Sequence, residues 1–448
     1  MSVEDYAPGK VVVELTADAN ALVSDVITDT AEGGAYIGFG IETVDGVLAS
    51  LPVESVIRLY AEVEPYEVDP DLISSMLATY VIRLSEDTDI DATIETLIQL
   101  DEIAHAEPAG LCDLTAIPND PSYGDQWGLD MINAPLAWDR QKGSDTVKIT
   151  IIDSGCDSNH PDLAPRLGTS TRGKGWDFCE NPTVGYGSQR VGDFTSPDDD
   201  PQDELGHGTS MAGIIGAATD NGIGIAGVTW GCRLLAARVV CRTITPSGGV
   251  GSGCNTDEMA KAIQWAGEYS QVANISLVSL IGDTKHLRDA VNYALQANTT
   301  VVAGMGNDNS NILRYPAAYD GVIAVGAVTK LRLQWIGGPT SGSNTGNHMS
   351  VSAPGSKVKT LDLYSTWGSP QYTEATGTSP AAAFVSGIAG LLYSCNINLT
   401  PRQVKQIIEQ TASHNVPDPS WTWPNPVYGN GIVDAKAAVD RVIDGPLP

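Results

Sequence analysis

Four polar residues of this chain are of types that together perform nucleophilic acyl transfer. Each stands among small or apolar side chains: Asp153 ends KITIID, His207 lies in GHGTSMAGIIGAA, Asn307 follows VVAGMG and Ser379 lies in ATGTSPAAAF. A serine hydroxyl attacks a carbonyl carbon when a histidine accepts its proton and a carboxylate orients that histidine. An asparagine amide can donate a hydrogen bond to the oxyanion that then forms.

Each of these residues also has a purely structural interpretation when taken alone. Asp153 and Asn307 follow apolar runs and would then stabilise turns, and His207 would start a helix without a further role. Ser379 is a good helix N-cap and Pro380 a good first helical residue. A serine at a helix start also lies in the positive field of the helix dipole, and its N–H is free to bind an oxyanion. Only the joint occurrence of the four settings favours catalysis.

The elements that must position these residues alternate from about residue 130 onward. Apolar segments that predict strands lie at 147–153, 233–240, 274–281, 300–306 and 321–328, and segments of helical character lie at 207–218, 256–270, 285–297 and 380–394. Strands that are apolar on both faces and alternate with helices indicate a parallel sheet covered on both sides. We therefore expect an α/β fold with a doubly wound parallel sheet, and a site at the carboxyl ends of its strands.

The N-terminal part of the chain predicts a separate, small α+β unit. Strands are expected at 10–15, 55–63, 77–84 and 103–108, and helices at 19–30 and 89–100. Asp91 is the expected N-cap of the second helix. Residues 109–127 are rich in turn-forming residues and have no clear period, which predicts a linker. The expected domains are therefore 1–113 and 114–448.

The charge of the chain disfavours nucleic acid as a partner. The 448 residues carry a net charge of −30, which would repel a phosphate backbone. Residues 1–117 contain 24 acidic and 3 basic residues, and the remainder contains 31 and 22, so the two parts carry −21 and −9. This asymmetry indicates two units with different roles, although a well-solvated acidic domain would also explain it. No uninterrupted apolar run is long enough to predict a membrane span.

Neither the start of the chain nor its cysteines define the compartment. The segment MSVEDYAPGKVVVEL has no basic stretch followed by an apolar one, so the protein is either intracellular or has lost a signal peptide. The seven cysteines contain no CxxC pair, which disfavours zinc. Cys241 and Cys254 bracket a glycine-rich loop and would close it as a disulfide. Buried, reduced thiols are the alternative.

The chain resembles the subtilisin-like serine proteases, or subtilases, over about residues 118–440. The matching segments are IIDSGCDSNHPDL, GHGTSMAG, VVAGMGN and GTSPAAAFVSGIAGLL, and the regions IPNDPSYGDQWGLDMINAPLAWD and YGNGIVDAKAAV are similar to thermitase-like members. The resemblance implies hydrolysis of peptide bonds with Ser379 as nucleophile, His207 as general base and Asp153 as its orienting carboxylate. It also implies that Asn307 and the Ser379 N–H bind the oxyanion.

The resemblance further implies a pocket for P1, the substrate residue before the cleaved bond. Its expected lining is Ser276, Leu277, Val278, Gly304 and Arg314. Val278 stands where the family commonly has glycine, so it should narrow the pocket. A buried Arg314 guanidinium would favour Asp or Glu at P1. If Arg314 instead points to solvent, the usual apolar preference of the family holds.

Structural calcium is also implied. The segment AATDNGIGIAGV is similar to the calcium loop of the family, whose ligands here would be the carbonyl oxygens of Thr219, Ile223 and Ile225 and the side chains of Asn221, Asp120 and Asp162. Such mixed oxygen ligation suits Ca²⁺. The acidic segment SPDDDPQDELG is either a solvated loop or a second calcium site that uses Asp198, Asp200 and Asp203.

Residues 1–113 are similar to the propeptide of the family, because AHAEP follows a β-α-β pattern. Such a propeptide assists folding of the catalytic domain and inhibits it, so the chain would be a self-processing zymogen. Asp113 is the expected cleavage point if P1 is acidic. A large propeptide favours export over an intracellular location. The expected partners are this propeptide and a protein or peptide substrate, and neither nucleic acid nor a membrane.

Two departures from the family pattern leave other functions open. Ala383 stands where the family commonly has proline, which would let Ser379 shift and favour attack by amines, as in a transpeptidase or ligase. Ser210 replaces a second histidine, a change that should not affect the proton relay. A catalytically silent binding protein with the same fold is the remaining alternative.

Overall fold

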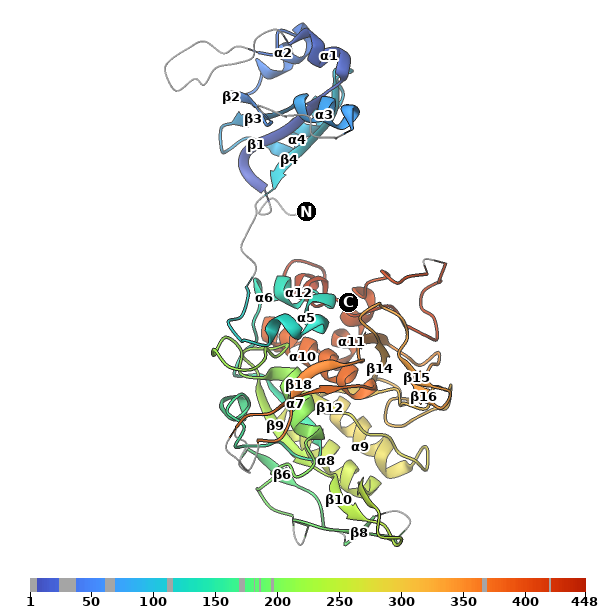
Figure 1. Ribbon diagram of the computed structural model, residues 1–448. Helices are drawn as coiled ribbons and strands as arrows, with labels where there is room; N and C mark the ends of the chain where they lie inside the picture. The colour runs from blue at the N-terminus through green and yellow to red at the C-terminus, as the bar shows by residue number, and fades with distance from the viewer. Residues whose placement is uncertain are drawn as a thin grey trace. The chain divides into compact units, whose positions relative to one another are not determined.

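The computed structural model divides the chain into two compact units, Met1–Leu114 and Thr115–Pro448 (Figure 1). Each unit is a body with its own core. The structure describes residues 6–23, 38–60, 69–110, 116–168, 174–180, 182–184, 187–194, 197–364, 369–418 and 420–448. Cys112 and the expected cleavage residue Asp113 lie outside the described residues.

The first unit contains an antiparallel sheet with helices. Its strands are β1 (Tyr6–Leu15), β2 (Val53–Arg58), β3 (Thr79–Leu84) and β4 (Ile103–Gly110), in the spatial order β2-β3-β1-β4. Its helices are α1 (Ala17–Leu22), α2 (Glu42–Leu48), α3 (Pro70–Leu77) and α4 (Ile90–Leu97). Alternate apolar residues of the strands, such as Val11 and Val13, form one core with residues of the helices, such as Leu97.

Two details of this unit differ from the expectation. The helix predicted from residue 89 is capped by Asp89 rather than Asp91, since the Asp89 carboxylate accepts a hydrogen bond from the Ala92 N–H at 3.0 Å. An N-cap must precede the first helical residue, whereas Asp91 lies inside the first turn. Helices α2 and α3 were not predicted, because each is only two turns long. Most of the expected helix 19–30 lies outside the described residues.

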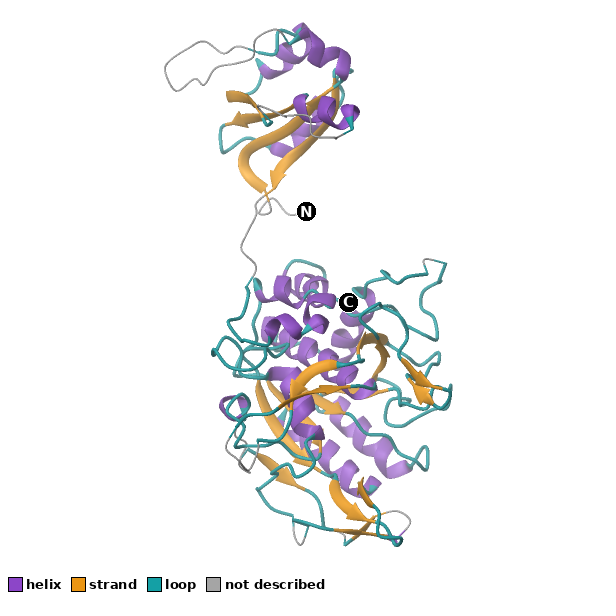
Figure 2. Ribbon diagram, viewed as in Figure 1, coloured by secondary structure: helices purple, strands orange, loops and turns teal. Residues whose placement is uncertain are grey.

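The second unit is built on a seven-stranded, fully parallel sheet (Figure 2). The strands, in spatial order, are β17 (Val351–Pro354), β14 (Ile323–Val328), β13 (Thr300–Gly304), β12 (Val272–Ile275), β5 (Lys148–Asp153), β9 (Arg233–Arg238) and β6 (Gly175–Asp177). Five of them are the predicted strands, whereas β6 and β17 are too short to show a pattern. Strand β12 ends at Ile275, so residues 276–281 leave the sheet instead of extending it.

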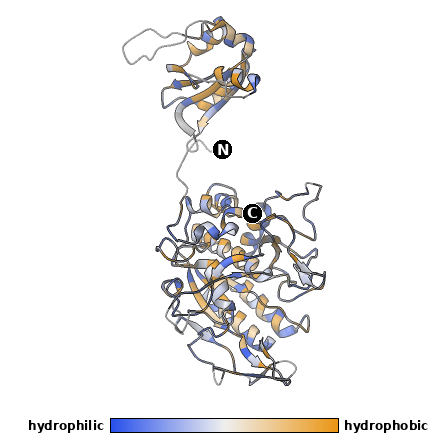
Figure 3. Cartoon of the chain, viewed as in Figure 1, coloured by the Kyte–Doolittle hydropathy of each residue, from blue (hydrophilic) through white to orange (hydrophobic). Residues whose placement is uncertain are grey.

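Helices cover both faces of this sheet, as the apolar strands require. Helices α7 (His207–Gly216) and α10 (Thr378–Cys395) share one core with Ile149 and Ile151 of β5. Helices α8 (Thr256–Tyr269) and α9 (Lys285–Gln296) share a second core with Ile152 on the other face. Apolar residues are correspondingly concentrated on the strands and the helices against them (Figure 3). The predicted doubly wound α/β fold is confirmed.

Shorter elements complete the second unit. They are η3 (Tyr123–Asp125), α5 (Trp127–Met131), α6 (Ala134–Trp138), η4 (Ala164–Arg166), β7 (Thr183–Val184), β8 (Ser188–Arg190), β10 (Cys241–Ile244), β11 (Val250–Gly253), β15 (Ile336–Gly338), β16 (Ser341–Gly342), β18 (Val358–Leu361), β19 (Tyr372–Ala375), α11 (Pro401–Gln410) and α12 (Ala435–Ile443). Among the described helices, α10 has the length and composition of a membrane span, but 83% of it is buried in the core.

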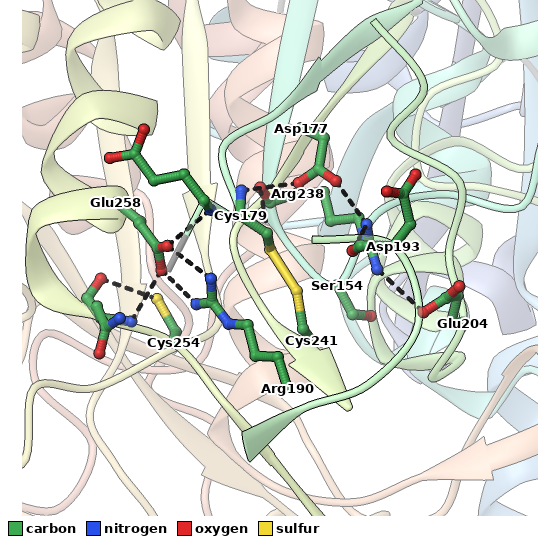
Figure 4. Close-up of a disulfide and its surroundings, with 12 residues drawn as sticks. Ser154, Asp177, Cys179, Arg190, Asp193, Glu204, Arg238, Cys241, Cys254 and Glu258 are labelled. Atoms are coloured by element: carbon green, nitrogen blue, oxygen red, sulfur yellow. Dashed lines mark hydrogen bonds and ion pairs between the residues drawn. A yellow bond between two sulfur atoms is a disulfide. The ribbon is translucent and has the colours of Figure 1, made fainter. Parts of the chain in front are cut away.

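A disulfide joins Cys179 to Cys241 (Figure 4). The expected pairing of Cys241 with Cys254 is therefore wrong, and Cys254 is a free thiol. Strands β10 and β11 form the hairpin that the two cysteines bracket, and backbone pairing of Cys241 with Gly253 already closes it without a covalent bond. The disulfide instead ties this hairpin to the segment that follows β6.

Candidate active site

Asp153 and His207 form a hydrogen-bonded pair. His207 Nδ1 lies 2.7 Å from Asp153 Oδ1, and the Ser154 N–H donates to the same oxygen at 2.7 Å. Because a carboxylate only accepts, Nδ1 is the donor and Nε2 is left for another partner. The Asp153 side chain is 1% exposed, whereas that of His207 is 45% exposed. The buried negative charge of Asp153 raises the pKa of His207 above its usual value.

Small residues allow His207 to start α7 at this place. Gly206, the N-cap, has a φ of 88°, which favours glycine. At Gly208 a Cβ would lie 2.1 Å from the Gly155 carbonyl oxygen, so any side chain would force α7 away from the loop after β5. The Gly208 N–H also donates to Ser154 Oγ at 2.9 Å. The GHG sequence thus brings the imidazole beside the strand that carries Asp153.

Ser379 lies at the start of α10, two residues further into the helix than expected. The N-cap is Gly377 and Thr378 is the first helical residue, so the prediction of Ser379 as the cap is wrong. A side chain from another element takes over capping, because Asn307 Oδ1 accepts from the Thr378 N–H at 2.8 Å. Ser379 still lies in the first turn, where backbone N–H groups have no partner within the helix.

The sheet brings Ser379 and the Asp153–His207 pair to one edge. Ile152 of β5 pairs with Ile275 of β12, so Asp153 and Ser276 follow at adjacent strand ends. Ser276 and Ser379 exchange two hydrogen bonds of 3.3 Å, each hydroxyl donating to the carbonyl oxygen of the other residue. Among the described residues, no hydrogen bond joins Ser379 Oγ to His207.

Asn307 follows β13 at the same edge, and its amide is held in one orientation. Its Oδ1 accepts from the Thr378 N–H at 2.8 Å and from the Thr378 hydroxyl at 3.0 Å, so Nδ2 is the end left to donate. Gly377 leaves room for the amide, because a Cβ at this position would lie only 3.0 Å from Asn307 Nδ2. Asn307 and Ser379 line one pocket. This geometry suits donation to a negatively charged oxygen beside Ser379.

The pocket next to Ser379 has a volume of about 190 Å³. It is lined by Ser276, Val278, Leu280, Gly304, Gly306, Asn307, Asp308, Arg314, Thr378 and Ser379. Leu277 was expected here but packs against the core beneath α8 and α9. The alternation of side chains in an extended segment would have selected Leu280 with Ser276 and Val278, and excluded Leu277.

Arg314 lines the pocket and forms an ion pair with Asp308. Asp308 accepts from Arg314 Nε and from Nη2, both at 2.9 Å. Asn344 Nδ2 adds a third hydrogen bond to Asp308 at 3.0 Å, and Arg314 lowers the pKa of Asp308. The expected acidic P1 preference needed an unpaired guanidinium, and the pair removes that basis. Arg314 does not point to solvent, since its side chain is 17% exposed.

Two buried carboxylates from other segments contact the predicted calcium loop. Asp162 and Asp120 are 0% and 4% exposed, and burial raises the pKa of both, that of Asp162 to about 6. Asn221 Nδ2 donates to Asp162 Oδ1 at 2.9 Å, and the Asp220 N–H donates to Asp120 Oδ2 at 2.8 Å. Buried carboxylates without a cationic partner are costly. Their raised pKa values fit a site that a cation completes.

The predicted carbonyl ligands belong to the same loop. Within the described part of the chain, no N–H or O–H group donates to the carbonyl oxygens of Thr219, Ile223 and Ile225. Together with the carboxylates they form an oxygen-only donor set, which is the type that Ca²⁺ prefers.

The second acidic segment is arranged differently from the expectation. Asp203 does not join the acidic group that contains Asp198, and its two oxygens accept four hydrogen bonds from residues around the start of α7. Asp198 instead lies with Asp177 and Asp193, their carboxylate oxygens all within 4.8 Å of one another among the described acidic groups. Asp177 already has a cationic partner in Arg238 at 2.5 Å.

Comparisons with known proteins agree on one family. The model described as "Subtilase family" matches residues 144–434. A thermophilic serine proteinase of Bacillus sp. (strain AK1) is 37% identical over 325 residues, 72% of this chain and 71% of that protein. Thermitase of Thermoactinomyces vulgaris is 36% identical over 297 residues, 66% of this chain and 91% of that protein.

A solved structure extends this agreement to the fold. A protease of Pseudoalteromonas arctica PAMC 21717 matches with a TM-score of 0.61 and 28% identity, covering 73% of this chain and 100% of that one. Residues 144–434, which the family model matches, contain the parallel sheet and the segments that carry His207 and Ser379. The chain therefore belongs to the subtilase family and is a subtilisin-like serine protease.

Proposed function

We propose that this protease cleaves peptide bonds with Ser379 as nucleophile, His207 as general base and acid, and Asp153 as the carboxylate that orients the imidazole. The observation that carries the proposal is the Asp153–His207 hydrogen bond of 2.7 Å at the sheet edge where Ser379 and Asn307 line a pocket. Asp153 accepts a hydrogen bond from the His207 Nδ1–H, so His207 Nε2 is the nitrogen that accepts a proton.

The reaction begins when the Ser379 hydroxyl turns from the Ser276 carbonyl oxygen to His207 Nε2. The present hydroxyl contact of 3.3 Å is long, so little is lost in that rotation. Ser379 Oγ then attacks the peptide carbonyl while His207 takes the proton, and the imidazolium gives it to the leaving amine. Water then attacks the carbonyl of the acyl-enzyme while His207 takes its proton. The imidazolium returns that proton to Ser379 Oγ as the acyl group leaves as a carboxylic acid.

The oxyanion formed in each step is bound by two donors. They are Asn307 Nδ2, whose orientation Thr378 fixes, and the Ser379 N–H in the first turn of α10. Both donors are in place before the substrate arrives, so they stabilise charge without reorganisation. Loss of one such donor typically costs about 10²–10³ in kcat, a magnitude measured in a related subtilisin.

For P1 we propose uncharged side chains. The Asp308–Arg314 pair gives the pocket no net charge, and a P1 carboxylate would compete with Asp308 for the same guanidinium. Val278 and Leu280 add apolar surface to the lining. An uncharged P1 side chain requires neither displacement of Asp308 nor desolvation of a further charge.

Calcium is proposed as a structural ion of the loop 219–225. Asp120, Asp162, Asn221 and the three backbone carbonyl oxygens would hold it. A bound cation would neutralise the two buried carboxylates and tie the N-terminal segment of the second unit to the loop after α7. Its contribution is to stability, and it takes no part in the proton transfers.

The first unit is proposed to be a propeptide that self-processing removes. The support is the boundary between two compact units at residues 114 and 115, together with an N-terminal charge of −21 against −9 for the remainder. Such a domain assists folding and occupies the active site until it is cleaved. Like charges on the two parts would favour their separation after cleavage.

The experiment compares the wild type with Ser379→Ala and His207→Ala in buffer that contains Ca²⁺. Hydrolysis of a peptide library, labelling by a fluorophosphonate probe and intact mass are measured for each protein. Under the proposal, only the wild type hydrolyses the library and reacts with the probe. Only the wild type also shows a mass that corresponds to loss of the first unit. Labelling of Ser379→Ala to the same extent as the wild type, or hydrolysis by either variant, would refute it. Self-processing that continues in Ser379→Ala would refute the zymogen proposal alone.

A further inference from the structure

The loop before α7 contains a buried carboxylate that holds the start of the helix. Asp203 is 4% exposed. Its Oδ1 accepts from the N–H groups of Leu205 at 2.8 Å and Gly206 at 3.0 Å. Its Oδ2 accepts from the Thr209 N–H at 2.9 Å and from the Thr209 hydroxyl at 2.7 Å. The four donors flank His207 on both sides, so Asp203 bridges the chain across that residue.

The neighbouring residue anchors the same loop to the sheet. Glu204 accepts from Arg238 Nη2 at 3.1 Å (Figure 4). Arg238 is the last residue of β9, is 1% exposed and also donates to the Asp177 carboxylate at 2.5 Å. Figure 4 shows this series of charges beside the disulfide of Cys179. The loop that contains Asp203 is therefore fixed to a strand as well as to α7.

We propose that Asp203 is a positioning residue for His207: it fixes the first turn of α7 and adds a second buried negative charge beside the imidazole. The inference rests on the proposed role of His207 as the general base. Asp203 touches neither the substrate nor the reacting atoms, so it acts only through the histidine. An ionised carboxylate suits these four donors, because both of its oxygens act only as acceptors.

Electrostatics supports the same assignment. Asp153 at the end of β5 and then Asp203 before α7 raise the pKa of the His207 imidazole, whereas burial lowers it. A third carboxylate approaches from the segment after β18, since Asp362 Oδ1 lies 3.0 Å from where a Cβ at Gly206 would be. Burial raises the pKa of Asp203 itself, while its hydrogen bonds to Thr209, Leu205 and Gly206 oppose that rise. A charge that favours the imidazolium favours the proton transfer from Ser379.

Asp157 provides a matched control. It is 3% exposed and accepts from Gln202 Nε2 at 2.8 Å, from the Asn159 N–H at 2.9 Å and from the Tyr364 N–H at 2.6 Å. Its charge acts on His160, whereas His207 responds to the other two aspartates. Asp157→Asn and Asp203→Asn thus remove equally buried charges from the same region, and only one of them faces His207.

The test measures kcat and KM against pH for wild type, Asp203→Asn and Asp157→Asn, with the active fraction counted by fluorophosphonate labelling. For Asp203→Asn we expect a kcat about tenfold lower, a KM within about twofold, and an acid midpoint lower by roughly 0.5 pH unit. Asp157→Asn keeps the wild-type midpoint. A purely structural role would reduce the labelled fraction without moving the midpoint, and this result, or an equal shift in both variants, overturns the proposal.

A second pair of variants covers the case in which Asp203→Asn does not fold. Thr209→Val removes the hydroxyl that donates to Asp203 at 2.7 Å, and Thr209→Ser retains it. We expect kcat to fall about threefold or more in Thr209→Val relative to Thr209→Ser, with similar KM values. Equal kcat values overturn the proposal. His207→Ala keeps the two questions separate, because activity in that variant refutes the general base and not the contacts of Asp203.

Discussion

At the scale of single residues, the P1 pocket shows how one neighbouring carboxylate limits what a charged side chain can bind. Arg314 lies where the resemblance places it, but Asp308 accepts two hydrogen bonds from its guanidinium. A bidentate pair of this kind leaves the arginine little capacity for a substrate carboxylate. Asp308 follows Asn307 directly in the sequence, and no pattern in the chain indicates that it turns toward Arg314.

Substitution of Asp308 by Asn should create a preference for acidic P1 residues. The freed guanidinium would pair with a P1 carboxylate, so we expect the ratio of kcat/KM for P1 Glu over P1 Gln to rise about tenfold or more, or about 1.4 kcal/mol. The ratio cancels effects common to both substrates. Asp283→Asn, which breaks the exposed Asp283–Arg288 pair, serves as the control. An unchanged ratio in Asp308→Asn would show that Arg314 does not reach P1.

The His207 pKa predicts the acid limit of activity. Asp153 holds this pKa above the usual 6.5, and only the neutral imidazole accepts the Ser379 proton. Activity should therefore be lost as the pH falls through a single midpoint above 6.5. Removal of the charge in Asp153→Asn lowers the pKa, so the midpoint moves to lower pH and kcat falls by about 10⁴. A pH profile of kcat/KM with the same midpoint in both proteins contradicts this assignment.

At the scale of elements, the disulfide and the ion pairs hold the segment between β6 and α7 against the sheet. Cys179 and Cys241 are 62 residues apart, and the two ends belong to the segment after β6 and to β10. Arg190 and Glu258 pair nearby with both side chains fully buried (Figure 4). This segment contains Asp203 and Glu204, so its anchoring bears on the position of α7.

Removal of the disulfide should destabilise the second unit. Closure of a loop of this length lowers the entropy of the unfolded chain, which raises the free energy of unfolding by about 4 kcal/mol in the chain-entropy description. In the Ser379→Ala background, which prevents self-digestion, Cys179→Ala with Cys241→Ala should lower the thermal midpoint, and Cys254→Ala should not. Peptide mapping should find Cys179 linked to Cys241. A Cys241–Cys254 peptide, or equal midpoints for all variants, would contradict the pairing.

At the scale of the whole molecule, stability depends on how buried charges are compensated. The chain carries a net charge of −30, so each buried carboxylate adds to a general repulsion. Arg238 compensates Asp177, whereas the carboxylates of Asp120 and Asp162 accept hydrogen bonds only from neutral donors within the part of the chain that the structure describes. A calcium ion at the loop 219–225 would supply the missing positive charge.

Removal of calcium should therefore lower the thermal midpoint of the full chain. For Ser379→Ala, free Ca²⁺ at 100 times its dissociation constant adds about 2.7 kcal/mol, which corresponds to roughly 5 °C or more. In Asp162→Asn this calcium-dependent shift should disappear. Asp198→Asn, in the second acidic group, should retain it. Calorimetry with Ca²⁺ and with EDTA measures the shift, and a shift that Asp198→Asn abolishes instead would assign the ion to that group.

The sequence by itself determined the class of fold, because apolar runs that alternate with helical segments have few packing solutions other than a covered parallel sheet. It also predicted Asp153, His207, Asn307 and Ser379 as catalytic residues, because the settings of these residues are local and the order of the four segments is specific. These features depend on residues close together in the chain.

Only the tertiary structure decided the features that depend on partners far apart in sequence. Asn307 caps α10 through Thr378, 71 residues away, and so displaces Ser379 from the cap. Cys241 pairs with Cys179 and not with Cys254, which is closer to Cys241 in the sequence. Backbone hydrogen bonds close the hairpin between Cys241 and Cys254 without a disulfide. Asp203 directs both of its oxygens to the start of α7 and lies outside the acidic group of Asp177, Asp193 and Asp198. In each case competition among several possible partners is resolved by which groups the packed sheet and helices bring within hydrogen-bond distance.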